Sequence, residues 1–171
     1  MTGPAAPADL LAALEHVGWT VAVAESLTGG LVVAALVDVP GASRSLRGGV
    51  VAYATDLKGT LLDVPAELLA ARGAVDPDVA AAMARGVRAR LVADVGLATT
   101  GVAGPDPQDG HPPGTVHVAV ATPTATRVLS LDLPGDRAQV RRAARDAVLA
   151  LAVETVTGGT GGAVGPVGAR A

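Results

Sequence analysis

Residues 20–37 read TVAVAESLTGGLVVAALV, and this stretch decides the fold class. Its first part, Thr20–Ala24, is a short apolar run with β-branched residues, which predicts a buried strand. A glycine-containing turn, Glu25–Gly30, follows, and Leu31–Val37 is an apolar helical segment. A strand, a turn and a helix in this order begin an α/β unit.

The rest of the chain alternates helical and strand patterns around this unit. Further strands are predicted over Gly48–Tyr53, Val95–Thr100, Thr115–Ala121 and Arg127–Leu133. Helices are predicted over Asp9–His16, Asp56–Leu62 and Pro65–Arg72, then after a cap at Asp76 and after a cap at Asp136. The last two strands are joined by a short turn, so we expect an antiparallel pair within a mixed sheet of about five strands, covered on both faces.

Length and composition suit one globular domain, predicted over residues 1–156, with a glycine-rich tail over 157–171 expected to be disordered. Half of the 171 residues are apolar, yet phenylalanine is absent, so the core must be packed from Ala, Val and Leu. The net charge of −3 comes from interspersed acids and bases, which argues against nucleic-acid or membrane-surface binding. No stretch is long and apolar enough to span a bilayer, and we expect a cytoplasmic protein.

One stretch brings together residues that could do chemistry: Ser43, Tyr53 and Lys58, the only lysine among 13 basic residues. Unlike arginine, lysine can lose its proton when it is desolvated and then act as a base. A serine nucleophile with a lysine base is therefore worth testing. From the pattern alone, a serine that caps a turn and a solvated lysine are the favoured interpretation.

Ligands of open α/β sheets bind beyond the strand ends. Three turns near predicted strand or helix ends offer groups that could bind one: Glu25–Gly30, Thr99–Pro105 and Gly135–Arg137. In each case a helix cap, a tight turn or exposed arginines is the simpler alternative. The first turn could bind an anion through hydroxyls and bare N–H groups, and the two arginines after Gly135 suit a phosphate or carboxylate. The candidate binding residues are Glu25, Ser26, Thr28, Gly29, Gly30, Thr100, Gly101, Gly104, Arg137 and Arg141.

Metal and cofactor chemistry finds little support in the sequence. The three histidines stand on separate elements without a carboxylate cluster, cysteine is absent, and neither a P-loop nor a dinucleotide fingerprint occurs. We therefore expect no metal and no cofactor.

Taken together, several motifs carry a resemblance to a known family. They are Ala24–Gly30, Pro40–Ser43, Gly48–Tyr53 with Lys58, Gly73–Val75, Thr100–Pro105, Gly114–Val116 and Gly135–Arg137. In order and spacing, from about Leu10 to Val156, the chain resembles the CinA C-terminal domain family, the stand-alone nicotinamide-nucleotide amidohydrolases also called PncC. The resemblance implies a three-layer α/β/α sandwich with a mixed, mostly parallel sheet, and a homodimer or higher homo-oligomer.

The resemblance also implies an activity, the deamidation of nicotinamide mononucleotide to nicotinic acid mononucleotide and ammonia in pyridine nucleotide salvage. It assigns Ser43 as the nucleophile, Lys58 as its base and Tyr53 as an assistant. The glycine turns, Thr100 and Arg137 would hold ribose and phosphate. Where the family usually has a lysine, this chain has His111. Alternatives are a non-catalytic nucleotide-binding or interaction module linked to competence or DNA damage, and a hydrolase of larger pyridine-nucleotide adducts.

The predicted strand Gly48–Tyr53 raises a geometric question, because six strand residues advance about 17 Å. Ser43 and Lys58 flank this strand and should lie at its opposite ends. Either the chain before the strand folds back along it, which we slightly favour, or Ser43 of one subunit meets Lys58 of another.

Overall fold

In the computed structural model, which describes residues 5–158, five strands form one mixed sheet in the order β2-β1-β3-β4-β5. The strands are β1 (Val21–Glu25), β2 (Leu46–Val51), β3 (Val95–Gly101), β4 (Thr115–Ala121) and β5 (Thr126–Asp132). β1 pairs in parallel with β2 and β3, whereas β4 pairs antiparallel with β3 and β5. The predicted mixed sheet is confirmed: only β4 runs against the other strands.

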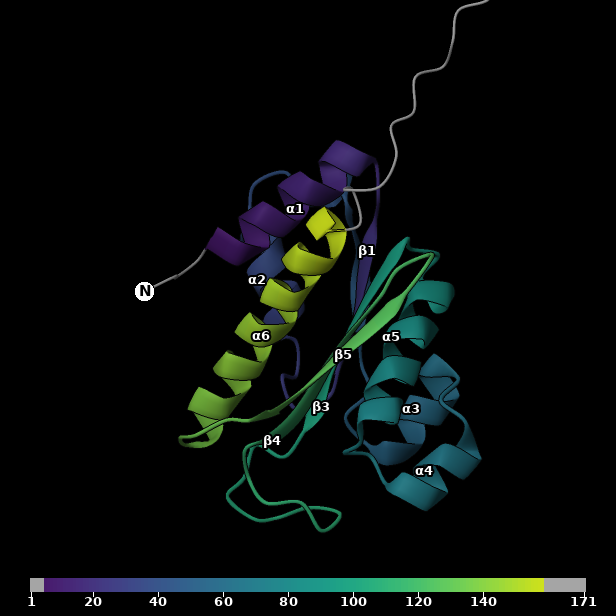
Figure 1. Cartoon of the computed structure of the whole chain (residues 1–171), viewed down its shortest axis with the longest axis vertical. Coiled ribbons are helices and arrows are strands. Elements are labelled where there is room, and N and C mark those ends of the chain that lie inside the picture. Colours follow the sequence, from purple (N-terminus) through teal and green to yellow (C-terminus); the bar gives the residue numbers. More distant parts are fainter. Residues whose placement is uncertain (1–4, 159–171) are drawn as a thin grey trace, which may run out of the picture.

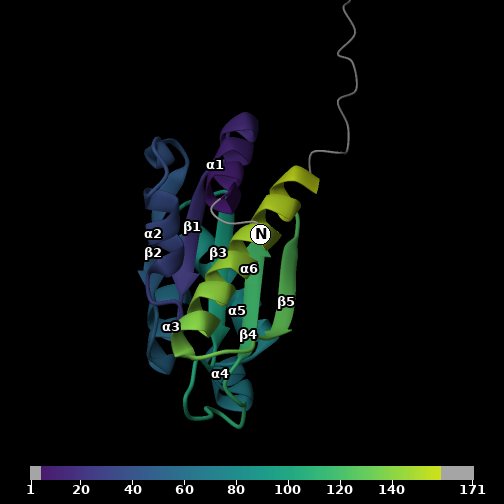
Figure 2. The ribbon, with the colours of Figure 1, turned by 90° about the vertical axis from the view of Figure 1, so that its left-hand side faces the viewer.

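Helices cover both faces of this sheet, which confirms the three-layer α/β/α architecture (Figure 1; Figure 2). One face carries α1 (Ala5–Val17), α2 (Leu31–Val37) and α6 (Arg137–Gly158). The other carries α3 (Thr55–Leu62), α4 (Ala66–Arg72) and α5 (Pro77–Arg90). α6 continues two residues beyond the predicted domain end at 156, and residues 159–171 of the predicted tail lie outside the described part. No helix within residues 5–158 is long and apolar enough to cross a membrane.

The core is divided by side-chain size, because successive strand residues point to opposite faces. In β1, Val21 and Val23 pack toward α1, α2 and α6, whereas Ala22 and Ala24 pack toward α5. The small alanine side chains on this face of the sheet allow α5 to pack close to the strands. A Cβ on Gly96 of β3 would overlap the backbone carbonyl of Ala84 in α5.

Two predicted helix caps are confirmed. The carboxylate of Asp76 accepts a hydrogen bond from the N–H of Asp78 (2.7 Å) at the start of α5. At the start of α6, Asp136 accepts from the N–H of Gln139, and the Gln139 side chain accepts in return from the N–H of Asp136, both at 2.8 Å. These reciprocal bonds form a capping box and fix where α6 begins.

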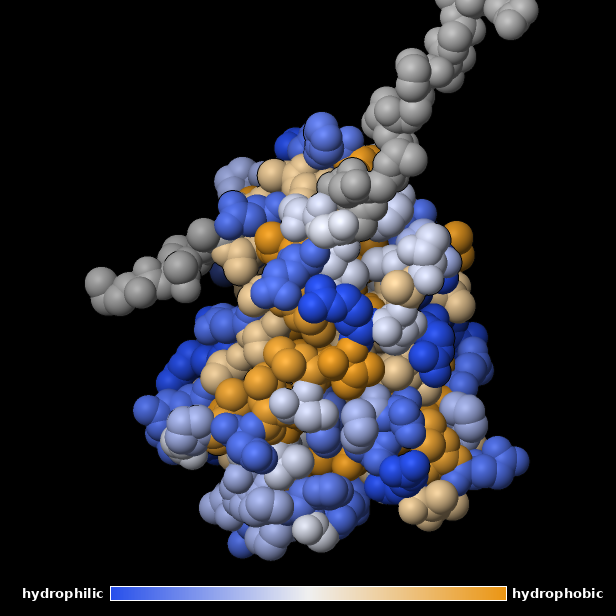
Figure 3. Space-filling view, viewed as in Figure 1, coloured by the Kyte–Doolittle hydropathy of each residue, from blue (hydrophilic) through white to orange (hydrophobic). Residues whose placement is uncertain are grey.

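The two ends of the sheet differ in exposure. The side chains of β4 are nearly all buried, whereas every residue of β5 is at least partly exposed. Val128 and Leu129 of β5 are about 40% exposed, and the surface between α6 and β5 carries a hydrophobic area (Figure 3).

Candidate active site

The only lysine of the chain is buried, contrary to the expectation of a solvated side chain. Lys58 lies in the middle of α3, and only 1% of it is exposed. Its Nζ donates to the carbonyl oxygens of Ala52 (2.8 Å) and Tyr53 (3.3 Å) and lies 3.0 Å from Oγ of Ser26. No carboxylate forms an ion pair with this amine among the described residues.

Burial changes the acid–base character of this amine. Loss of water lowers the pKa of Lys58 from its usual 10.5 to about 8, while the carboxylates of Asp109 and Asp56 oppose the shift. A pKa near 8 leaves roughly a tenth of the amine neutral at pH 7, far more than a solvated lysine provides. Lys58 is thus suited to accept a proton close to neutral pH.

Sheet register brings Ser26 to Lys58. Glu25 at the end of β1 stands beside Val51 at the end of β2, so the next residues, Ser26 and Ala52, leave the sheet side by side. The Ala52 N–H donates to the Glu25 carbonyl (2.9 Å) and continues the ladder by one step. Lys58 then contacts both Ser26 and Ala52. The pair therefore lies at the carboxyl edge of two parallel strands, where α/β proteins bind ligands.

Ser43 is not part of this pair. The prediction that Ser43 contacts Lys58 within one chain is wrong. Ser43 is exposed in the 3₁₀ turn Ala42–Arg44, which precedes the amino end of β2. The chain does not fold back, because Leu46–Val51 runs directly along β1. The hydroxyl beside Lys58 is that of Ser26, so no second subunit is needed to complete the pair.

Beside Ser26 lies a cavity of about 230 Å³. It is lined by loops that follow β1, β2 and β3 and by the segment before α5. Of the predicted binding residues, Ser26, Thr100, Gly101, Gly104 and Arg137 line it, as does Tyr53. The other lining residues were not predicted to bind a ligand, although five of them lie in the quoted motifs. They are Leu27, Ala54, Thr55, Ala74, Val75, Val102, Ala103, Asp106 and Gln108.

Arg137 and Tyr53 form one wall of the cavity. The Arg137 guanidinium donates to the carbonyl of Gly104 (2.6 Å) and to the Tyr53 hydroxyl (3.1 Å). Tyr53 is 60% exposed, so this contact holds an otherwise solvated phenol over the cavity. A guanidinium has five N–H groups, and these two bonds leave donors free for a ligand.

The segment before α5, which also lines the cavity, is held by two hydrogen bonds. Ala74 donates its N–H to the carboxylate of Asp109 (3.0 Å), and its carbonyl accepts from the Thr100 hydroxyl (2.6 Å). A Cβ on Gly73 would lie 2.9 Å from that carboxylate, so the glycine makes room for it. Thr100 thus shapes the cavity with its hydroxyl already engaged.

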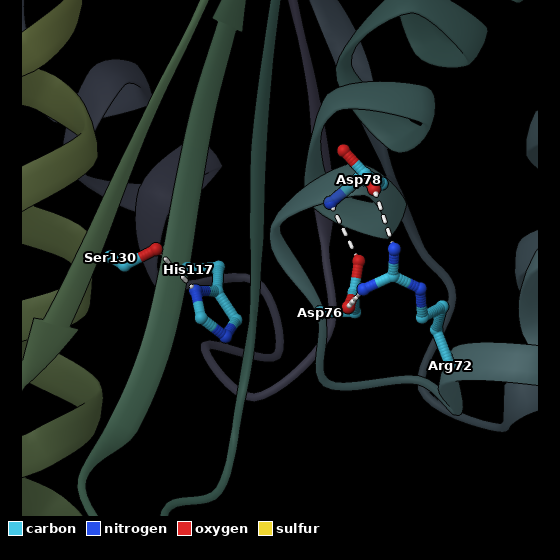
Figure 4. Close-up of polar contacts among 5 residues, drawn as sticks. All are labelled: Arg72, Asp76, Asp78, His117 and Ser130. Atoms are coloured by element: carbon cyan, nitrogen blue, oxygen red, sulfur yellow. Dashed lines mark hydrogen bonds and ion pairs between the residues drawn. The ribbon is translucent and has the colours of Figure 1, made fainter.

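Figure 4 shows two separate polar contacts near this segment, one at the start of α5 and one between β4 and β5. Arg72 contacts Asp76 at 3.4 Å and Asp78 at 3.7 Å, and His117 of β4 contacts the Ser130 hydroxyl at 2.8 Å. Burial lowers the pKa of His117, against the raising effect of the Asp76 carboxylate. His117 is thus paired with a side chain of the neighbouring strand β5.

The five remaining predicted binding residues do not line the cavity but form or support the loop after β1. They are Glu25, Thr28, Gly29, Gly30 and Arg141. Glu25 is fully buried, and its carboxylate accepts from the N–H groups of Gly30 (2.9 Å), Val32 (3.1 Å) and Val33 (2.9 Å), which leaves it no surface for a ligand. This contact satisfies backbone N–H groups at the start of α2.

Hydrogen bonds to β3 and α6 hold the same loop in place. The Thr28 hydroxyl bonds that of Thr99 at 2.8 Å. Arg141 of α6 donates to the carbonyls of Leu27 (2.8 Å) and Thr28 (2.9 Å). At Gly29 the backbone is left-handed (φ 58°), and a Cβ there would lie 3.3 Å from the Arg141 guanidinium. Arg141 thus holds the Ser26 turn and is not placed to bind ligand in the cavity.

Comparison with known proteins places this arrangement in a family. The model of the CinA C-terminal domain matches residues 5–156. The chain belongs to the CinA C-terminal domain family. A CinA-like protein of Frankia casuarinae is 58% identical over 122 residues, which cover 71% of this chain and 28% of that protein. A CinA-like protein of Gloeobacter violaceus is 49% identical over 143 residues, which cover 82% of this chain and 34% of that protein.

Solved CinA structures share the whole fold. A CinA superfamily protein of Klebsiella pneumoniae superposes with a TM-score of 0.88 at 30% identity, covering 92% of this chain and 99% of the other. A CinA superfamily protein of Escherichia coli gives 0.85 at 29% identity and covers 91% and 92%. The chain thus matches these structures nearly end to end, but spans about a third or less of the two CinA-like relatives.

Proposed function

We propose that this CinA-family domain is an amidohydrolase that deamidates nicotinamide mononucleotide to nicotinic acid mononucleotide and ammonia. The observation that carries the proposal is the 3.0 Å contact between Lys58 Nζ and Ser26 Oγ beside the cavity. The substrate comes from the resemblance of the motifs. The nucleophile differs from the one that the resemblance suggested, since Ser26 takes the place of Ser43.

The surroundings of Lys58 favour the base role. A neutral amine has two N–H groups, and the carbonyls of Ala52 and Tyr53 can accept both. The lone pair then faces the third neighbour, the Ser26 hydroxyl. The same two carbonyls would hold the amine in place as it gains a proton. Lys58 therefore needs no movement between its neutral and charged forms.

The reaction follows from this geometry. Ser26 Oγ attacks the carboxamide carbon while its proton passes to Lys58 Nζ. Backbone N–H groups of the cavity loops stabilise the oxyanion. As the C–N bond breaks, Lys58 returns the proton to the leaving nitrogen, and ammonia departs. Lys58 then takes a proton from water, the hydroxide attacks the acyl ester, and Ser26 leaves with that proton.

Arg137 and Tyr53 complete the proposal. The free donors of Arg137 suit the phosphate of the nucleotide. The Tyr53 hydroxyl, held by that guanidinium at 3.1 Å, lies at the cavity wall and assists in substrate positioning. The proposed reaction needs no metal or cofactor. A homodimer or higher homo-oligomer in the cytoplasm stays a prediction, and light scattering coupled to gel filtration tests the oligomer.

An ammonia-release assay tests the proposal. Wild-type protein is compared with Ser26→Ala on nicotinamide, its riboside, its mononucleotide and the dinucleotide. We expect fastest release from the mononucleotide, and a loss of at least about a thousandfold in the variant with its circular dichroism spectrum unchanged. Release from the dinucleotide alone would favour a larger adduct as substrate. No release from any of the four, although the protein binds a nucleotide, would favour a non-catalytic module.

A further inference from the structure

Two side chains of opposite charge line the cavity beside Ser26. They are Arg137, from the start of α6, and Asp106, from the loop between β3 and β4, and they are the only charged residues among its lining. No ion pair joins them among the described residues. Arg137 donates to a carbonyl and a phenol, whereas Asp106 is exposed and its side chain makes no hydrogen bond within residues 5–158.

One positive and one negative side chain suit neither a purely anionic ligand nor an uncharged one. A carboxylate in the wall repels an anion, and an uncharged amide would not need a guanidinium. A ligand with a positive and a negative end satisfies both side chains at once. Both ends of such a ligand would lie in the cavity that Ser26 also lines.

We infer that Asp106 is a specificity-determining residue that selects substrates with a cationic, oxidised pyridinium ring over the neutral, reduced ring. The inference rests on the proposed function. Nicotinamide mononucleotide has a fixed positive charge on its ring nitrogen and negative charge on its phosphate. With the carboxamide at Ser26 and the phosphate at Arg137, the ring lies between them, and Asp106 faces its charge. The reduced nucleotide has the same phosphate and carboxamide but lacks the ring charge.

Binding to an inactive protein separates this inference from catalysis. Calorimetry with Ser26→Ala protein measures the affinity for oxidised and for reduced nicotinamide mononucleotide, each with and without Asp106→Asn. We expect Asp106→Asn to weaken binding of the oxidised form by about three- to tenfold and to leave the reduced form within about twofold. The difference should shrink as salt is added, because an exposed charge is screened.

Two further variants in the Ser26→Ala background serve as controls. Asp63→Asn removes the same charge from an exposed residue outside the cavity and tolerates its left-handed backbone (φ 55°), so both affinities should stay unchanged. Arg137→Met should weaken both forms, because both have the phosphate. Equal weakening of the two forms by Asp106→Asn, or none, would overturn the inference. Failure of the oxidised form to bind the Ser26→Ala protein would instead sink the proposed function, and this inference with it.

Discussion

The amine of Lys58 lies 3.0 Å from the hydroxyl of Ser26, although 32 positions separate them in the chain. The contact is a product of parallel pairing, since β1 and β2 end side by side and the residues just beyond them converge. It joins a buried lysine whose pKa is lowered to about 8 to a hydroxyl at the edge of a cavity.

Replacing Ser43 should have little effect, because this exposed serine lies before β2, away from Lys58. We expect ammonia release by Ser43→Ala within about twofold of wild type, and free energy of unfolding within about 0.5 kcal/mol. The same assay run on Ser26→Ala gives the contrast. A Ser43→Ala protein that folds normally and has lost its activity would restore the original assignment of the nucleophile.

The rate should follow the neutral form of Lys58. With a pKa of about 8, kcat/KM should rise close to tenfold per pH unit below pH 8 and level off above it. Lys58→Arg should lose activity by at least about a hundredfold at every pH, because a guanidinium stays protonated. Lys58→Met, which fills similar space, provides the check on folding. A profile that stays flat between pH 6 and pH 9 would contradict a lysine base.

Two carboxylates should affect the pH at which the rate rises, because they raise the pKa of Lys58. Asp109 is the stronger and Asp56 the weaker of the two that raise the pKa of Lys58. Removing either charge favours the neutral amine, so the rising limb should move to lower pH in Asp109→Asn and, by less, in Asp56→Asn. Asp109 also holds the Ala74 N–H, which asparagine can still bind through its amide oxygen. Asp63→Asn should leave the limb in place, and a shift to higher pH in Asp109→Asn would refute the electrostatic account.

Glu25 should matter for stability. Its two carboxylate oxygens accept three N–H groups of the α2 start, and in Glu25→Gln one oxygen becomes a donor that faces them. At least one buried N–H then lacks an acceptor, at a cost of about 1–3 kcal/mol in urea unfolding. Glu67→Gln, in the exposed first turn of α4, is the matched control and should change stability by less than about 0.5 kcal/mol. Equal stability of both variants would show that the contact is dispensable.

Two helical glycines should respond in opposite ways to alanine. A Cβ on Gly86 of α5 would overlap the backbone carbonyl of Leu62, whereas one on Gly59 of α3 would make ordinary contacts at 3.5 Å and 3.8 Å. Gly86→Ala should therefore lose at least about 2 kcal/mol, because the α3–α5 packing must open. Gly59→Ala should be neutral or gain up to about 1 kcal/mol from helix propensity. Thermal unfolding of both variants decides, and a stable Gly86→Ala protein would refute the close packing.

Local patterns predicted most of the fold. The apolar run and glycine turn of residues 20–37 placed β1 and α2, and Asp76 and Asp136 marked the starts of α5 and α6. α6 extends to Gly158, two residues past the predicted domain end at 156. Arg88 and Arg90 of α5 donate hydrogen bonds to the backbone carbonyls of Asp94, Leu61 and Thr60, which no helical pattern predicts. Such tertiary contacts have no signal in a local pattern.

The candidate site was predicted in part. Lys58, Tyr53 and Arg137 were singled out and do come together, but Ser26 was taken only as a binding residue. Proximity to Lys58 along the chain raised Ser43 as a candidate, and the family resemblance then assigned it as the nucleophile. Strand register would have indicated Ser26: in a parallel pair, residues just after the two strands meet, whereas residues at opposite ends of one strand cannot. That argument requires knowing that β1 pairs with β2, and the sequence alone did not establish this pairing.

The two carbonyls that hold Lys58 belong to the backbone of Ala52 and Tyr53. Every amino acid has a carbonyl, so mutation at either position alters the side chain and leaves the acceptor in place. Most single substitutions at these two positions should therefore leave the orientation of the Lys58 amine unchanged. Substitutions at cavity-lining loop residues such as Asp106 and Gln108 would not touch these two acceptors. The domain could thus acquire new substrates by drift in its loops while the machinery at Ser26 stays as it is.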